Sequence, residues 1–184
     1  MALEYGLTLA GDTPVDQVAA RAFPEVSERP TGVVLFADLK EKYGFDVTVV
    51  AERDGYLDLE TDDGSWEWEP ESDVRVDFRL DKFADLRWVV TNMLTVVRRV
   101  LDTGPEDAAF DFNGDILLFA RRKGELTKHR RDRWWDYYPS GDQLIPGEVT
   151  VGRRRSAWVR RRAAAGSPAS RPRRRGRWPG PPGC

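Results

Sequence analysis

The stretch from Asp85 to Asp102 is the feature of this 184-residue chain that most restricts its fold. Apolar side chains recur there at three- and four-residue steps, which predicts a helix with one broad apolar face. These side chains are Leu86, Val90, Met93, Leu94, Val97 and Leu101. The Thr-Gly-Pro sequence at 103–105 ends the helix, because glycine favours helix C-termini and proline cannot continue one. Such a helix needs a second layer that covers its apolar face.

Short strands are the second layer that the sequence predicts. Alternating or β-branched apolar residues indicate them, and Asp-Asp-Gly at 62–64 and Asn-Gly at 113–114 supply turns between two pairs. We expect an antiparallel meander over residues 56–80 and a half-buried first strand, and residues 38–44 also fit a helical turn. The expected strands span residues 3–9, 33–39, 45–51, 56–61, 65–69, 73–80, 108–112 and 115–121.

A short helix over residues 14–22 completes the predicted fold. Thr13 offers an N-cap, and Pro14 suits the first helical position. The fold class is therefore α+β, with a mostly antiparallel sheet on which the helices 14–22 and 85–102 pack, in the order β-α-β(n)-α-β-β. A last ordered piece is expected to reach Tyr138.

The charge balance changes abruptly near the end of the chain. Residues 1–148 hold all 31 acidic residues but 18 of the 29 basic ones, a balance of −13, and eleven arginines follow. We predict an acidic domain over 1–147, which attracts basic partners, and an Arg/Pro-rich, disordered tail over 148–184. The tail is a nucleic-acid-binding arm, a solvated basic tail, or a product of out-of-frame or read-through translation.

Residue types argue against several classes of protein. No run of about 18 apolar residues predicts a membrane span, and the start of the chain lacks a signal-peptide pattern, so we expect a cytoplasmic protein without a membrane partner. The lone cysteine, Cys184, cannot form an internal disulfide. The lone histidine, His129, has no identifiable nucleophile nearby, which favours a charged surface loop over a general base. We expect neither enzyme activity nor a cofactor.

One acidic spacing resembles a calcium-binding loop. Asp58, Glu60, Asp62 and Glu69 fall at its first, third, fifth and twelfth places, where oxygen ligands are needed. The sixth place is Asp63, however, where the loop needs glycine, and the flanks predict strands instead of helices. With one histidine and one terminal cysteine, zinc is disfavoured too, so no metal is expected.

The predicted hairpin over residues 56–69 carries the main binding hypothesis. Strand alternation places Leu57, Leu59 and two tryptophans on one face and acidic residues on the other. Like charges on neighbouring strands destabilise a sheet by up to about 1 kcal/mol per pair, a cost that a basic partner offsets. In the alternative, Arg75 and Arg79 on the next strand neutralise these carboxylates. The candidate partner-binding residues are Tyr56, Asp58, Glu60, Asp62, Asp63, Glu67 and Glu69.

Four clustered aromatic residues give a second set of candidates for partner binding. They are Trp134, Trp135, Tyr137 and Tyr138. Such rings either anchor a protein interface or pack the last segment onto the core.

Further phrases of the sequence belong to no catalytic motif. They are MALEYGLTL at the start, YGF at 43–45, WEWEP at 66–70, FRLDKF at 78–83, NML at 92–94 leading into DTG at 102–104, NGD at 113–115, and the stretch 129–135. Over about residues 1–147 the chain resembles the Sit-type immunity proteins of bacterial polymorphic toxin systems. The tail lies outside this similarity.

The resemblance implies a small intracellular protein that protects its producer by binding a cognate toxin. A domain charge of −13 suits a basic toxin such as a nuclease. We expect stoichiometric inhibition, in which the acidic hairpin face and the aromatic residues occlude the toxin's active site. The runner-up is a nucleic-acid-associated protein that acts through the tail, and the third hypothesis is an enzyme that uses His129. The sequence leaves the oligomeric state open.

Overall fold

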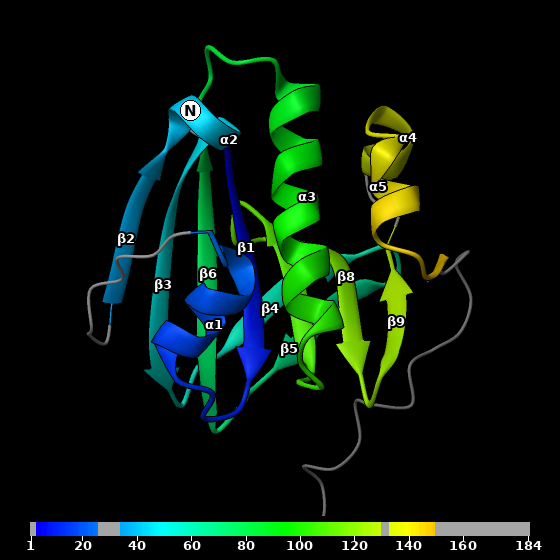
Figure 1. The fold of residues 1–184 in the computed structure, drawn as a ribbon. Coiled ribbons are helices and arrows are strands. Elements are labelled where there is room, and N and C mark those ends of the chain that lie inside the picture. The colour runs from blue at the N-terminus through cyan, green and yellow to red at the C-terminus, as the bar shows by residue number, and fades with distance from the viewer. Residues whose placement is uncertain (1–2, 26–33, 130–132, 150–184) are drawn as a thin grey trace, which may run out of the picture. The chain divides into compact units, whose positions relative to one another are not determined.

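The structure is a computed structural model that describes residues 3–25, 34–129 and 133–149 (Figure 1). Its strands are β1 Leu3–Ala10, β2 Val34–Leu39, β3 Phe45–Arg53, β4 Leu57–Thr61, β5 Gly64–Trp68, β6 Ser72–Leu80, β7 Ala108–Phe112, β8 Ile116–Arg122, β9 Glu125–Lys128 and β10 Glu148–Val149. Its helices are α1 Val15–Ala22, α2 Lys40–Tyr43, α3 Leu86–Asp102, α4 Trp134–Tyr137 and α5 Ser140–Leu144.

One sheet contains all the described strands. Eight of them follow the order β10-β9-β8-β7-β1-β6-β3-β2, and β4 and β5 attach beside this path. All pairs are antiparallel except β9 with β10 and the single bridge that joins Glu60 of β4 to Ile116 of β8. The predicted α+β class with a mostly antiparallel sheet is therefore confirmed.

The main core lies between this sheet and the helices α1 and α3, which run across one of its faces (Figure 1). Of the α3 side chains on the predicted apolar face, Leu86 is partly buried there and the other five are buried. Val89, Val96 and Val100 are buried as well and widen this face. Asp85 caps α3, because its carboxylate accepts a hydrogen bond from the backbone N–H of Trp88 at 3.0 Å. The prediction of a helix over residues 85–102 is confirmed.

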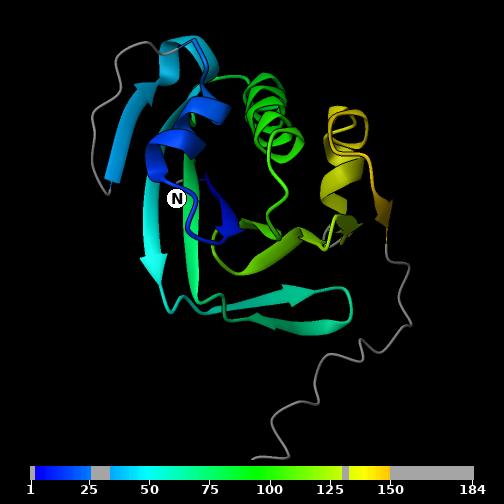
Figure 2. The ribbon, with the colours of Figure 1, turned by 60° about the horizontal axis from the view of Figure 1, so that its bottom comes forward.

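The hairpin β4–β5 covers part of the opposite face of the sheet, below β7 and β8 (Figure 2). A second, smaller apolar cluster fills this contact, and its buried members are Leu59, Trp68, Ala109, Leu117 and Ala120. The predicted meander is wrong, because β5 pairs with β4 and not with β6. Both edges of β6 are already occupied, one by β1 and the other by β3, so β5 has no edge to join.

The first strand is also more buried than predicted. From Tyr5 to Leu9 every residue of β1 is buried, on both faces of the sheet. The strand runs between β6 and β7, and the face that was expected to meet solvent is covered by the side chains of Arg75 and Asp111. The alternating pattern therefore predicted correctly which face of β1 meets the core, but it did not predict that the other face is buried too.

Smaller departures from the prediction lie at the ends of elements. Thr13 does not cap α1, because its hydroxyl donates to Glu106 Oε1 at 3.0 Å. The helical turn considered for residues 38–44 is α2. The hairpin β8–β9, the helix α5 and the strand β10 were not predicted. Strand β10 continues the described sheet past Gly147, where the domain was expected to end. The rest of the predicted tail, residues 150–184, lies outside the described residues.

In the described part of the chain, no helix combines the length and the apolarity needed to cross a lipid bilayer.

Candidate protein-binding face

The β4–β5 hairpin turns one side toward the sheet and the other toward solvent. Its register pairs Leu57 with Trp68 and Leu59 with Trp66, and these side chains lie on the inner side. The guanidinium of Arg122 lies 4.8 Å from the centre of the Trp68 ring and covers it. The predicted alternation of apolar and acidic faces is therefore confirmed. Burial of the apolar side fixes the register of the two strands.

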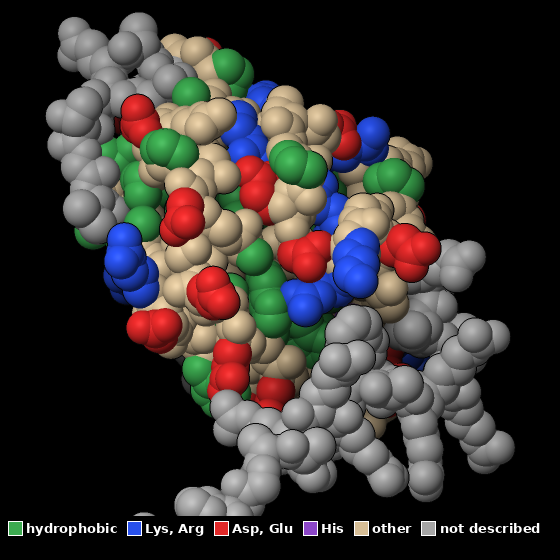
Figure 3. Space-filling view, turned by 90° about the horizontal axis from the view of Figure 1, so that it is seen from below, with side chains coloured by type: hydrophobic (Ala, Val, Ile, Leu, Met, Phe, Trp, Pro, Cys, Tyr) green, Lys and Arg blue, Asp and Glu red, His purple; other side chains and the backbone are tan. Residues whose placement is uncertain are grey.

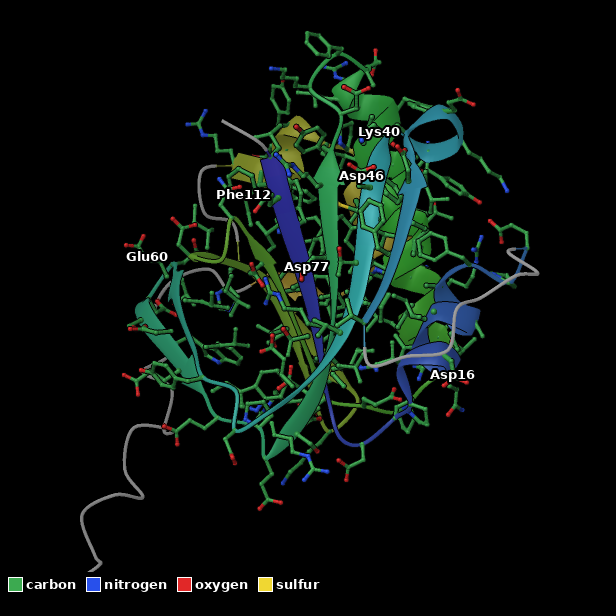
Figure 4. The ribbon with its side chains drawn as sticks, turned by 90° about the vertical axis from the view of Figure 1, so that its left-hand side faces the viewer. Asp16, Lys40, Asp46, Glu60, Asp77 and Phe112 are labelled. Carbon is green, nitrogen blue, oxygen red and sulfur yellow. The ribbon has the colours of Figure 1, made fainter. Side chains whose placement is uncertain are left out.

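The outer side of the hairpin is acidic, and we call Asp58, Glu60, Glu67 and Glu69 the acidic face. All four residues are exposed. Asp58 lies directly opposite Glu67 across the two strands, the like-charge arrangement that the sequence predicts. The hydroxyl of Ser65 donates a hydrogen bond to Asp58. Glu60 points outward at the edge of the molecule, away from the sheet (Figure 4).

The turn of the hairpin adds two further exposed carboxylates, Asp62 and Asp63. Thr61 fixes the turn, since its hydroxyl donates to the carbonyl of Gly64 at 2.8 Å. Gly64 has a φ of 119°, a conformation that side chains rarely adopt. The acidic residues are therefore held on a defined hairpin and not on a long loop.

Neither arginine that was considered as an internal neutraliser is directed at the acidic face. Arg75 binds Asp77 through Nε at 2.7 Å and Asp111 through Nη1 at 3.0 Å. Arg79 lies 3.8 Å from Glu4, on the far side of β1 from the hairpin cluster. These contacts weaken the reading in which the next strand neutralises the hairpin. Seen from below, acidic side chains are spread over the visible surface, with basic ones between some of them (Figure 3).

His129 lies beside the hairpin turn and is buried, so the predicted surface loop is wrong. Its side chain is 8% exposed, and its backbone N–H donates to the carbonyl of Leu118 at 2.9 Å. Burial lowers the pKa of His129, whereas the negative charges of Asp62 and Asp63 raise it. His129 directly follows β9, the second strand of the β8–β9 hairpin that was not predicted.

Three of the four clustered aromatic residues are packed inside. Trp134, Trp135 and Tyr138 are buried, and Trp134 Nε1 donates to the hydroxyl of Tyr5 at 3.2 Å. Their burial favours the core-packing alternative for these three rings. Tyr137 is exposed, and the guanidinium of Arg87 lies 5.9 Å from its ring centre. It lines an open hollow of about 510 Å³ at the end of β1.

The calcium-loop spacing falls on extended strands. Asp58 and Glu60 lie on β4, Asp62 lies in the turn, and Glu69 follows β5. Across the described residues, no group of three or more His, Cys, Asp or Glu side chains is arranged to hold a metal ion.

Comparison with known proteins adds one match. A family model described as SitI3-like matches residues 3–139. The chain belongs to the SitI3-like family. In this SitI3-like protein the matched residues include the whole β4–β5 hairpin, both main helices and the strands β1 to β9. Neither curated proteins nor solved structures gave a match. The family assignment agrees with the resemblance to Sit-type immunity proteins and favours an immunity role.

Proposed function

We propose that this protein neutralises a cognate toxin in the cytoplasm by binding it stoichiometrically, without turnover. The observation that carries the proposal is the acidic face, which a defined hairpin presents to solvent in a member of the SitI3-like family. An antitoxin that blocks an active site needs an accessible, rigid surface and no catalytic group of its own.

The charge of the domain supports a basic toxin as the partner. The balance of −13 over residues 1–148 attracts a basic partner and accelerates the encounter with it. Asp58 and Glu67 repel each other across the hairpin, and cationic side chains of the partner relieve that repulsion on binding. A basic toxin that acts on nucleic acid has a cationic active-site cleft, so the acidic face covers the surface that the toxin's substrate would occupy.

Co-expression tests the proposal. The toxin gene is sought beside the gene for this chain and is expressed in a sensitive host with the full chain or without it. We expect survival only with the chain, a co-purifying 1:1 complex, and no chemical change in the toxin after the complex is dissociated. Survival without a stable complex, or a covalently modified toxin, would contradict neutralisation by binding.

Deletion of residues 150–184 separates this proposal from action through the tail. The proposal expects the shortened chain to protect the host as well as the full chain does, because the acidic face lies within residues 58–69, outside the deleted segment. A tail that acts on nucleic acid would instead lose a salt-sensitive affinity for DNA or RNA on deletion. Loss of protection together with that affinity would favour the tail as the active part.

A further inference from the structure

A polar pocket lies at the base of the β4–β5 hairpin, where the chain leaves β3 and turns into β4. Its volume is about 290 Å³. The residues that matter for its chemistry are Thr8, Glu52, Gly55, Tyr56, Asp73 and Arg75. Of these, only Tyr56 was predicted from the sequence to bind a partner. The sequence did not predict the pocket, because these six residues come from β1, β3, the β3–β4 connection and β6, which only the fold brings together.

The carboxylate of Asp73 is the unusual group in this lining. The residue is 4% exposed, and its Oδ1 accepts no hydrogen bond from any residue that the structure describes. Gly55 leaves room for it, since a Cβ at that position would lie 2.7 Å from Oδ1. A buried carboxylate oxygen without a donor costs free energy, so the pocket lacks a hydrogen-bond donor that would complement it.

A second carboxylate stands beside Asp73. Glu52 of β3 is its direct neighbour in the antiparallel register of β3 and β6. Burial raises the pKa of Asp73, and the charge of Glu52 raises it further, while Arg75 lowers it. Two neighbouring carboxylates repel each other in this position, and a cation placed between them relieves the repulsion.

The positive charge of Arg75 does not satisfy this pair. Its guanidinium is held by Asp77 at 2.7 Å and by Asp111 at 3.0 Å, and it also donates to the hydroxyl of Thr8 at 3.1 Å. Two carboxylates therefore already compensate the one charge of Arg75. The remaining charged groups of the lining, Glu52 and Asp73, leave the pocket negative.

We propose that this pocket binds the guanidinium group of an arginine side chain on the protein partner, paired with Asp73 and Glu52 and stacked on the ring of Tyr56. A guanidinium fits better than an ammonium, because its planar fork pairs with carboxylates and its face stacks on an aromatic ring. The inference rests on the proposed function, and it extends the binding surface from the acidic face to the base of the same hairpin.

A small probe tests the pocket without any toxin. The amide of N-acetyl-arginine, which carries one positive charge, is titrated into the isotope-labelled full chain and followed by amide NMR shifts. We expect saturable shifts centred on Gly55, Tyr56 and Thr8. The lysine analogue is expected to bind more weakly. Absence of saturable shifts there, or a response at the same residues to calcium chloride and not to the arginine probe, would overturn the proposal.

Three variants make the titration specific. Asp73→Asn keeps the shape of the side chain and removes its charge, and we expect at least about a tenfold loss of probe affinity. Gly55→Ala keeps both carboxylates but places a methyl group against Asp73, and it is expected to weaken binding even if Asp73→Asn fails to fold. Asp54→Asn is the matched control. It removes one negative charge, as Asp73→Asn does, and it lies next to Gly55 on the β3–β4 connection but does not line the pocket. Equal effects of all three variants would overturn the proposal.

The outcome is distinguishable from failure of the proposed function. If Asp73→Asn binds the toxin as tightly as the unaltered chain does, the pocket is not part of the interface, although neutralisation by binding stands. If the probe binds and the chain forms no complex with the toxin, the pocket is a cation site and the proposed function fails.

Discussion

The guanidinium of Arg75 lies against the backbone of Gly6 at the centre of the sheet. A Cβ at position 6 would lie 2.0 Å from Nη2 of Arg75, so no side chain fits there while the arginine keeps its place. We expect Gly6→Ala to lower the free energy of unfolding by about 2 kcal/mol or more, the cost of overpacking a buried site. Urea denaturation measures this cost. In the background of Arg75→Met the same change is expected to cost much less, and equal costs in both backgrounds would refute the contact.

Asp111 forms an ion pair with Arg75. The side chain of Asp111 is fully buried, and that of Arg75 is 19% exposed. Burial raises the pKa of Asp111, against the opposing effect of Arg75. Removal of one partner leaves an uncompensated charge, so we expect Asp111→Leu alone to cost about 3–5 kcal/mol of stability. The double variant Arg75→Met with Asp111→Leu should recover most of this loss. Additive losses in chemical denaturation would show that the two groups do not act as a pair.

Glu106, which follows α3 in the chain, contacts residues at both ends of α1. Its carboxylate accepts hydrogen bonds from Arg21 at 2.6 and 2.9 Å and from Thr13 at 3.0 Å. The hydrogen bonds from Arg21 lower the pKa of Glu106 from 4.5 to about 2. Because the pKa is lower in the folded state, this contribution to stability is present above pH 4.5 and is lost as the pH falls toward 2.

Glu106→Gln tests that linkage. We expect a loss of about 1–3 kcal/mol in the free energy of unfolding at pH 7, which shrinks toward zero as the pH approaches 2. Glu71→Gln, at an exposed residue, is the matched control and should change stability little at any pH. A Glu106→Gln penalty that stays constant between pH 7 and pH 3 would contradict the pKa shift.

The titration of His129 reports on the position of the hairpin turn. Burial holds the pKa of the imidazole below its usual value of 6.5, and Asp62 and Asp63 oppose that effect. We expect an NMR midpoint below 6.5 that falls further in the double variant Asp62→Asn with Asp63→Asn. Since the folded pKa is lowered, stability is lost as the pH falls through 6.5. A midpoint that the double variant leaves unchanged would place the turn away from His129.

Local sequence patterns correctly predicted the helix α3 and the Asn113-Gly114 turn, because the residues of these elements favour their conformation by themselves. The α3 helix has its apolar stripe and its cap at Asp85, and both central residues of the Asn113-Gly114 turn have the positive φ that their types favour. The alternation along β4 and β5 likewise identified the acidic face, because the side of a strand follows from sequence alone once one face is buried.

Long-range pairing decided what the sequence could not predict. β5 was expected beside β6, but β3 and β1 occupy both edges of β6 and leave the hairpin to fold under β8. The pairing of β3 with β6 likewise brings Glu52 and Asp73 together from separate strands. The residues next to Glu52 and Asp73 in sequence do not specify this contact, so the pocket is visible only in the fold.

Calorimetric titration with the toxin encoded beside the chain tests the central claim, that the acidic face binds a basic partner. The test variant is Asp58→Asn, Glu60→Gln and Glu67→Gln. The control also loses three negative charges, but at exposed residues away from the hairpin, through Asp12→Asn, Asp16→Asn and Glu41→Gln. The label of Asp16 in Figure 4 lies across the molecule from that of Glu60. We predict 1:1 binding that the test variant weakens at least about tenfold, with a smaller salt dependence, while the control stays within about twofold of the unaltered chain. Equal affinities of the two variants would contradict the claim.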